Sequence, residues 1–139
     1  MRYLAIDYGN KRTGLAVCDP GEVICSPLCV LQTGVNIWDR VAKTAHQERA
    51  QAYVVGLPLN MDGSEGFQAE RVRTFAKQLA KVSSLPIHFQ DERLTSFSAS
   101  EKYAQMELSK GKKKKHIDAL AAAEILTAFL EARQEKATE

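Results

Sequence analysis

The sequence has no long apolar run. No stretch approaches the roughly 20 consecutive apolar residues that a helix needs to cross a bilayer. The N-terminal residues also lack the charged-then-apolar pattern of a secretory signal. We therefore expect a cytoplasmic protein that makes no contact with membranes.

Cysteine is scarce as well, with three residues, Cys18, Cys25 and Cys29, crowded into one short region. They lack the second pair of ligands that a structural zinc site needs. We expect them to be reduced and buried, acting as small hydrophobic side chains. An intermolecular disulfide is the less favoured alternative.

The 139 residues, 45% of them hydrophobic, suffice for one domain over residues 1–139, with a polar tail at 134–139 that we expect to fray. The net charge of +2 hides an asymmetry, because Lys110 and Lys112–Lys115 lie close together and leave the rest of the chain net negative. Such a segment favours a local anionic partner.

Hydrophobic spacing predicts the elements of the fold. We expect strands at 3–8, 13–19, 22–31, 52–57 and 86–90. We expect helices at 36–50 and 66–82, a third helix that follows Ser96 and ends near Leu108, and a last helix at 116–133, with a mobile loop at 109–115. Pro27 interrupts the third strand, which suits an edge or a bulge. An antiparallel meander followed by βαβ crossovers predicts an α/β fold with a mixed five-stranded sheet and helices on both faces.

Three acids stand where apolar elements begin or end. Asp7 closes the first strand, Glu92 follows the last strand, and Asp118 lies in the first turn of the final helix. Converging carboxylates repel one another unless a cation compensates them, and Mg²⁺ prefers such oxygen ligands. Two such ions could activate a water and stabilise the leaving oxygen of a phosphodiester.

Each acid also has a simpler explanation. Asp118 would complement the helix dipole, Asp91 and Glu92 would form a solvated strand end, and Asp7 would stabilise the turn that follows it. His116 would cap the last helix or carry protons near the acids.

Several cations lie close to these acids in the sequence. Lys11 and Arg12 occupy the turn after Asp7, and Lys112–Lys115 precede Asp118, so both groups are candidates for contact with phosphates. A stripe of Arg73, Lys77 and Lys81 is more typical of a solvated helix face.

Four segments resemble one family. IDYGNKRTGLAV, VVGLPLNMDGSEG, DERLTS and KKKKHIDALAAAEIL, in this order, are similar to the YqgF/RuvX family of bacterial proteins, which are described as pre-16S rRNA nucleases or Holliday junction resolvases. The similarity covers nearly the whole chain. The four motifs together are specific, whereas the first alone would be weak.

The resemblance implies an RNase H-like fold and a Mg²⁺-dependent nuclease, with Mn²⁺ as the alternative metal, that matures the 5′ end of 16S rRNA. It assigns the catalytic and metal-binding roles to Asp7, Glu92 and Asp118, and the preference for Glu92 over Asp91 rests on it. Nucleic-acid contacts are then expected from Lys11, Arg12, Arg93, Lys112, Lys113, Lys114, Lys115 and His116.

Other functions remain open. The substrate could be structured RNA, with ribosomal precursor particles as partners, or branched DNA, which would favour a homodimer over a monomer. The chain could also be a non-catalytic RNA- or ribosome-binding protein. Asp7, Gly9 and Gly14 resemble the first phosphate loop of actin-like ATPases, but the chain is too short for the two lobes of such a kinase relative.

Overall fold

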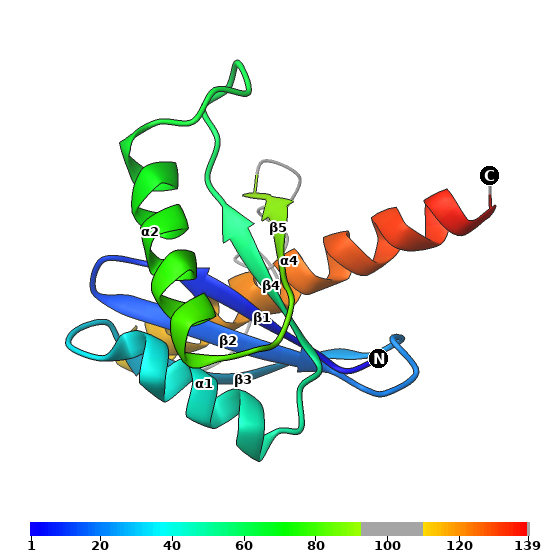
Figure 1. Ribbon diagram of the computed structural model, residues 1–139, viewed down its shortest axis with the longest axis horizontal. Helices are drawn as coiled ribbons and strands as arrows, with labels where there is room; N and C mark the ends of the chain where they lie inside the picture. Colours follow the sequence, from blue (N-terminus) through cyan, green and yellow to red (C-terminus); the bar gives the residue numbers. More distant parts are fainter. Residues whose placement is uncertain (93–109, 139) are drawn as a thin grey trace.

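Five strands form one mixed sheet in the computed structural model of the protein (Figure 1). Residues 1–92 and 110–138 are described, with side chains for 1–92 and 119–134. The strands are β1 (Tyr3–Tyr8), β2 (Arg12–Cys18), β3 (Cys25–Gln32), β4 (Ala52–Leu57) and β5 (Ile87–Asp91), and they lie in the order β3-β2-β1-β4-β5.

The strand pairing follows from the lengths of the connections. Short turns join β1, β2 and β3 as antiparallel neighbours, whereas β1, β4 and β5 are parallel and are joined through helices. The predicted mixed sheet is confirmed. Pro27 lies on the edge strand β3, next to a register shift between Leu15 and Ala16, as its missing N–H requires.

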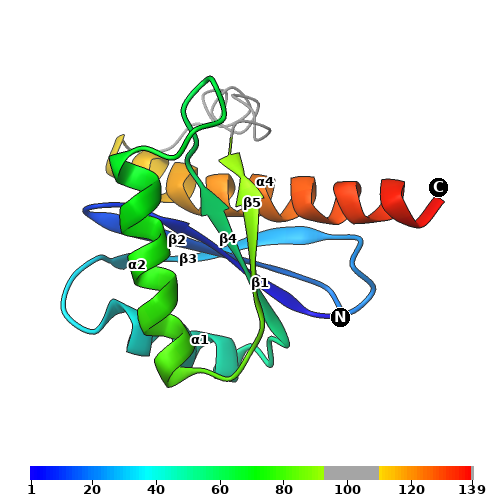
Figure 2. The ribbon, with the colours of Figure 1, turned by 45° about the horizontal axis from the view of Figure 1, so that its top comes forward.

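Helices cover both faces of the sheet. α1 (Ile37–Gln47) and α2 (Phe67–Val82) pack on one face, and α4 (Lys110–Thr138) crosses the other (Figure 2). Side chains of β1 alternate between two cores: Leu4 and Ile6 lie in the core under α1 and α2, and Tyr3 and Ala5 in the core under α4. The same alternation directs Asp7 to the α4 face.

The last helix is longer than predicted at both ends. It begins at Lys110, so the loop expected at 109–115 is wrong from Lys110 onward, and position 109 lies outside the described residues. The helix continues to Thr138, through most of the tail expected to fray. Lysine, glutamate, glutamine and alanine are good helix formers even where no apolar stripe marks the helix. The predicted helix ending at Leu108 lies outside the described residues. None of the described helices is both long and apolar enough to span a bilayer.

All three cysteines are free, with Cys18 buried and Cys25 and Cys29 half-buried. Burial raises the pKa of each thiol. They therefore act as weakly reactive apolar groups, as the sequence predicts, although two of them are only partly covered.

Candidate functional site

The site begins where β1 ends. Asp7 lies opposite Gly14 in the antiparallel ladder with β2, and the chain then turns within a few residues. A Cβ atom on Gly9 would lie 2.6 Å from the carbonyl oxygen of Arg12, so only glycine allows the turn to be this tight. The cationic turn is therefore held directly beside Asp7.

Two threonines tie this turn to the end of β3. The Thr33 hydroxyl donates to the Gly9 carbonyl at 2.8 Å and lies 2.7 Å from the hydroxyl of the fully buried Thr13. The Thr33 N–H also donates to the Lys11 carbonyl at 3.0 Å. The backbone that carries Lys11 and Arg12 is thus fixed against the sheet.

Glu92 reaches the same face from β5. In the register of β4 with β5, Gln90 lies opposite Gly56, and alternation directs Gln90 and Glu92 toward α4. A Cβ atom on Gly56 would lie 2.5 Å from Glu92 Oε1 and 2.6 Å from Ile125 Cδ1 of α4. The Glu92 carboxyl therefore occupies space above β4 that only a glycine leaves open.

The electrostatics show that the two acids are close to each other. Burial, the largest cause, and the neighbouring acids together raise the pKa of the Glu92 carboxyl from its ordinary value of 4.5 to about 8. Asp7 acts through charge repulsion and through a hydrogen bond with Glu92, and Asp91 adds repulsion. Without a cation, Glu92 therefore retains its proton near neutral pH and shares it with Asp7.

Two of the three predicted acids are thus brought together, on adjacent parts of the α4 face. The backbone of Asp118 lies in α4, one turn before the buried Ala122, but its side chain is outside the described residues. Among the side chains that are described, no three His, Cys, Asp or Glu residues form a group that could hold a metal. The convergence of all three acids stays a prediction.

The chemistry of the pair nevertheless fits a divalent cation. Asp7 and Glu92 offer hard carboxylate oxygens, half-buried beside each other, and their repulsion is the cost that a cation removes. Deprotonation of Glu92 would accompany binding of the cation.

Of the residues predicted to contact nucleic acid, Lys11 and Arg12 have side chains that the structure describes. They line a cavity of about 460 Å³ together with Asn10, Gln32 and Thr33, at the end of β3. The remaining side chains, those of Arg93, Lys112–Lys115 and His116, lie outside the described residues.

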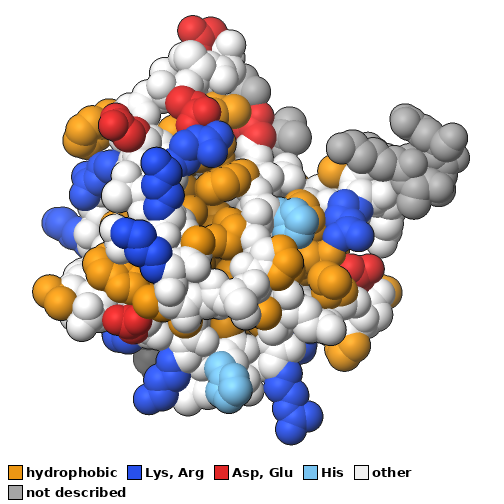
Figure 3. Space-filling model, viewed as in Figure 1, with side chains coloured by type: hydrophobic (Ala, Val, Ile, Leu, Met, Phe, Trp, Pro, Cys, Tyr) orange, Lys and Arg blue, Asp and Glu red, His pale blue; other side chains and the backbone are white. Residues whose placement is uncertain are grey.

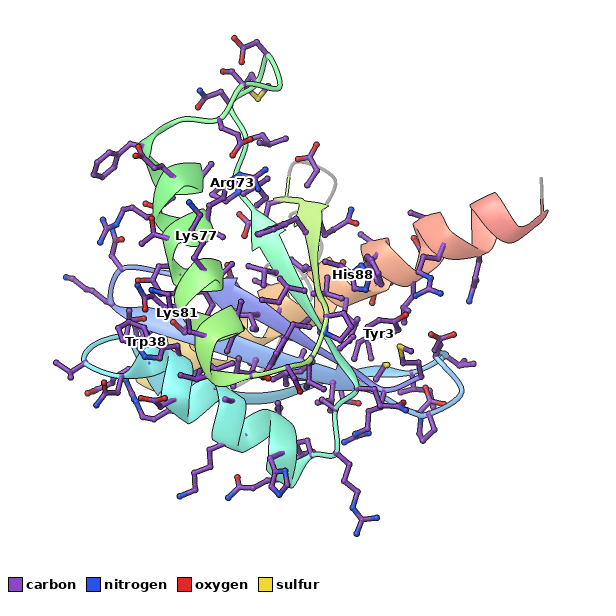
Figure 4. All side chains as sticks on the ribbon, viewed as in Figure 1. Tyr3, Trp38, Arg73, Lys77, Lys81 and His88 are labelled. Atoms are coloured by element: carbon purple, nitrogen blue, oxygen red, sulfur yellow. The ribbon has the colours of Figure 1, made fainter. Side chains whose placement is uncertain are left out.

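The basic stripe of α2 lies away from the carboxylate pair, on the opposite face of the sheet. Lys and Arg side chains gather over α2 in Figure 3, and Figure 4 shows Arg73, Lys77 and Lys81 in a row along it. Arg73 pairs with Glu65 and lies over the Phe89 ring at 4.8 Å. Arg73 therefore has local partners, as the reading of this stripe as a solvated helix face expects.

Sequence reasoning missed the roles of Gly56, Thr13 and Thr33. Gly56 interrupts the apolar run of β4, and an isolated glycine in a strand is a known signal of close approach. The two threonines left no signal, because their hydrogen bond joins β2 to the residue after β3 across 20 positions.

Comparisons with known proteins agree with this architecture. A family model described as "RuvX: Holliday junction resolvase" matches residues 1–132. A protein of Azotobacter vinelandii named "Putative pre-16S rRNA nuclease" is 41% identical over 132 residues, covering 94% of this chain and 93% of that protein. A relative of the same name from Anaeromyxobacter sp. (strain Fw109-5) is 39% identical over 135 residues, covering 96% and 98%.

Solved structures show the same fold at low sequence identity. RuvC of T. thermophilus, in complex with a Holliday junction substrate, has a TM-score of 0.59 at 16% identity and covers 97% of this chain and 96% of its own. The Fowlpox virus resolvase, in complex with Holliday junction DNA, has a TM-score of 0.60 at 12% identity, with 96% and 99% covered. The chain has an RNase H-like fold and belongs to the RuvX family of nucleases.

Proposed function

We propose that the protein is a divalent-metal-dependent nuclease that hydrolyses phosphodiesters during maturation of the 5′ end of pre-16S rRNA, acting on ribosomal precursor particles in the cytoplasm. The observation that carries this proposal is the pairing of Asp7 with Glu92 at the carboxyl ends of β1 and β5. The names of the relatives from Azotobacter and Anaeromyxobacter support the substrate.

In this proposal Asp7, Glu92 and Asp118 hold Mg²⁺, or Mn²⁺ in its place. The metal would supply an activated water and charge stabilisation at the leaving oxygen. Gly56 leaves room for the Glu92 carboxyl, and the threonine-anchored turn presents Lys11 and Arg12 to the phosphates. Lys112–Lys115, Arg93 and His116 would extend this contact along the substrate.

Branched DNA is the second candidate substrate. The description of the matching family model, as a Holliday junction resolvase, favours it. The same carboxylates would serve in both reactions, because each breaks a phosphodiester bond. The family assignment favours both over an actin-like ATP-binding relative.

The decisive experiment is cleavage of a precursor rRNA fragment and of a four-way DNA junction, each with Mg²⁺ and with a chelator. Asp7→Asn should lower the rate by about 10²-fold or more, because it removes a charge from the reacting centre. Asp39→Asn, the same change on the exposed first turn of α1, is the matched control and should cleave normally. Equal rates for parent and Asp7→Asn would show that the site is wrong.

A further inference from the structure

A cavity lined by aromatic rings lies on the other face of the sheet from the carboxylate pair. Its volume is about 310 Å³, and its rings come from Tyr8, Trp38, Phe67 and Phe75. Tyr8 directly follows Asp7, so the end of β1 presents one residue to each face. The cavity and the carboxylate pair therefore meet at the same edge of the sheet.

The rings comprise one stacked pair and one exposed ring. Tyr8 stacks on the buried Phe75, with centroids 4.6 Å apart and planes inclined by 16°. Phe67, in the first turn of α2, is 75% exposed, and the Arg71 guanidinium lies 5.7 Å from its centroid. Trp38 is half-buried at the start of α1, and Figure 4 shows it on the side of α2 away from His88.

The remaining lining is polar. Glu70, Arg71, Thr74 and Gln78 project from α2 along the cavity and supply both hydrogen-bond donors and acceptors. An aromatic floor with a polar rim is what a planar heterocycle with donors and acceptors on its edge requires. A hydrocarbon ligand would offer these polar groups no hydrogen bonds.

Charge around the cavity favours a ligand that carries phosphates. Arg71 at the rim is balanced by Glu70, but Lys11 and Arg12 follow Tyr8 by three and four positions in the adjoining turn and add positive charge. The volume is at the lower end of the range of ligand pockets, which suits one base and excludes a duplex.

We propose that this cavity binds one unpaired nucleobase of the substrate strand, close to the phosphodiester held at Asp7 and Glu92. The inference rests on the proposed nuclease function for the identity of the strand. It implies that the protein selects single-stranded or unpaired positions next to the cleavage point, because a paired base could not enter.

Trp38 is the only tryptophan in the chain, so its emission reports directly on the cavity. A short single-stranded RNA, titrated in the presence of a chelator to prevent cleavage, should quench this emission. The same RNA with an abasic nucleotide at successive positions should bind more weakly at one of them. Loss of one stacked base corresponds to about 10-fold in affinity.

Phe67→Ala should weaken RNA binding by about 10-fold without changing the melting temperature, because this ring is 75% exposed. Phe89→Ala is the matched control, since Phe89 is also an exposed phenylalanine beneath an arginine but lies outside the cavity. Its affinity for RNA should equal that of the parent.

The outcomes separate this inference from the proposed function. Normal cleavage, with RNA binding that leaves Trp38 emission unchanged, would overturn the nucleobase site and leave the nuclease intact. Quenching and a Phe67→Ala effect without any cleavage would support the nucleobase site and overturn the nuclease. Emission that responds only to mononucleotides, or only to protein concentration, would identify a free nucleotide or a second copy as the occupant and overturn the proposal.

Discussion

At the scale of single residues, Gly56 decides whether the Glu92 carboxyl can lie between β4 and α4. Gly56→Ala would place a methyl group 2.5 Å from Glu92 Oε1 and 2.6 Å from Ile125 Cδ1. We expect this variant to lose about 1–3 kcal/mol in the free energy of unfolding, as overpacked cores do. We also expect it to lose most of its nuclease activity. Urea unfolding and the cleavage assay would measure the two effects.

Gly34→Ala is the control for this change, because a Cβ atom on Gly34 would meet nothing within 4 Å. It should keep both stability and activity. If Gly56→Ala behaved like Gly34→Ala, the close approach of Glu92 to β4 would be disproved.

The proton that Glu92 shares with Asp7 leads to a second prediction at this scale. The pKa of Glu92 is about 8 in the folded protein and 4.5 ordinarily, so the folded state binds this proton more tightly than the unfolded state. In the metal-free protein, the contribution of Glu92 to stability should therefore fall as the pH rises from 4.5 to about 8, and level off above that.

Urea unfolding of parent and Glu92→Gln, at several pH values with a chelator present, would measure this contribution as a difference. Glu92→Gln cannot ionise, so its stability relative to the parent should increase over the same pH range. Parallel pH profiles would contradict the pairing of Glu92 with Asp7.

Asp7 and the neighbouring acids Asp91 and Glu92 could be selected from the sequence because acids at the ends of apolar strands are unusual, and the choice of Glu92 over Asp91 came from the family resemblance. Gly56 and Tyr8 could not be assigned roles in the same way. Their importance depends on which side chains lie across the sheet, and that is set by the register between β1, β4 and β5.

At the scale of elements, α4 carries the lysine run in its first turns rather than in a loop. Replacing Lys112–Lys115 by Gln should leave the helix intact, because the two residues have similar helix propensity. RNA binding should weaken, and the slope of log K against log salt should decrease by about 0.7 for each lost contact with a single strand.

Lys77→Gln with Lys81→Gln, on the exposed face of α2, is the control for these substitutions and should change the salt dependence little. Binding measured by fluorescence anisotropy at several salt concentrations would separate the two sets. An unchanged slope after replacement of Lys112–Lys115 would remove the start of α4 from the interface.

The apolar pattern predicted the buried elements and failed where the sequence has no apolar stripe. The continuous run at 52–57 matches β4 residue for residue, because every side chain of that strand is buried. The lysine run has no apolar stripe, so spacing analysis assigned it to a loop, although lysine favours helix when the rest of α4 continues it.

At the scale of the whole molecule, the sheet separates the two proposed functional surfaces, which meet at one edge. The carboxylate pair faces α4, the aromatic cavity faces α1 and α2, and both begin at the end of β1. A substrate strand that crosses this edge would have its phosphate on one side and its base on the other. The connection lengths predicted the mixed sheet, but the placement of helices required the handedness of the crossovers as well.

The position of α4 has a consequence for the order of folding. This helix is the last described element to be synthesised, yet it packs against β1, β2 and β3, which come from the first 32 residues. Until residues 119–130 are made, Tyr3, Ala5 and Ala16 face water, and Glu92 lacks the cover that raises its pKa. A growing chain therefore cannot assemble the carboxylate pair in its final surroundings until α4 has been synthesised.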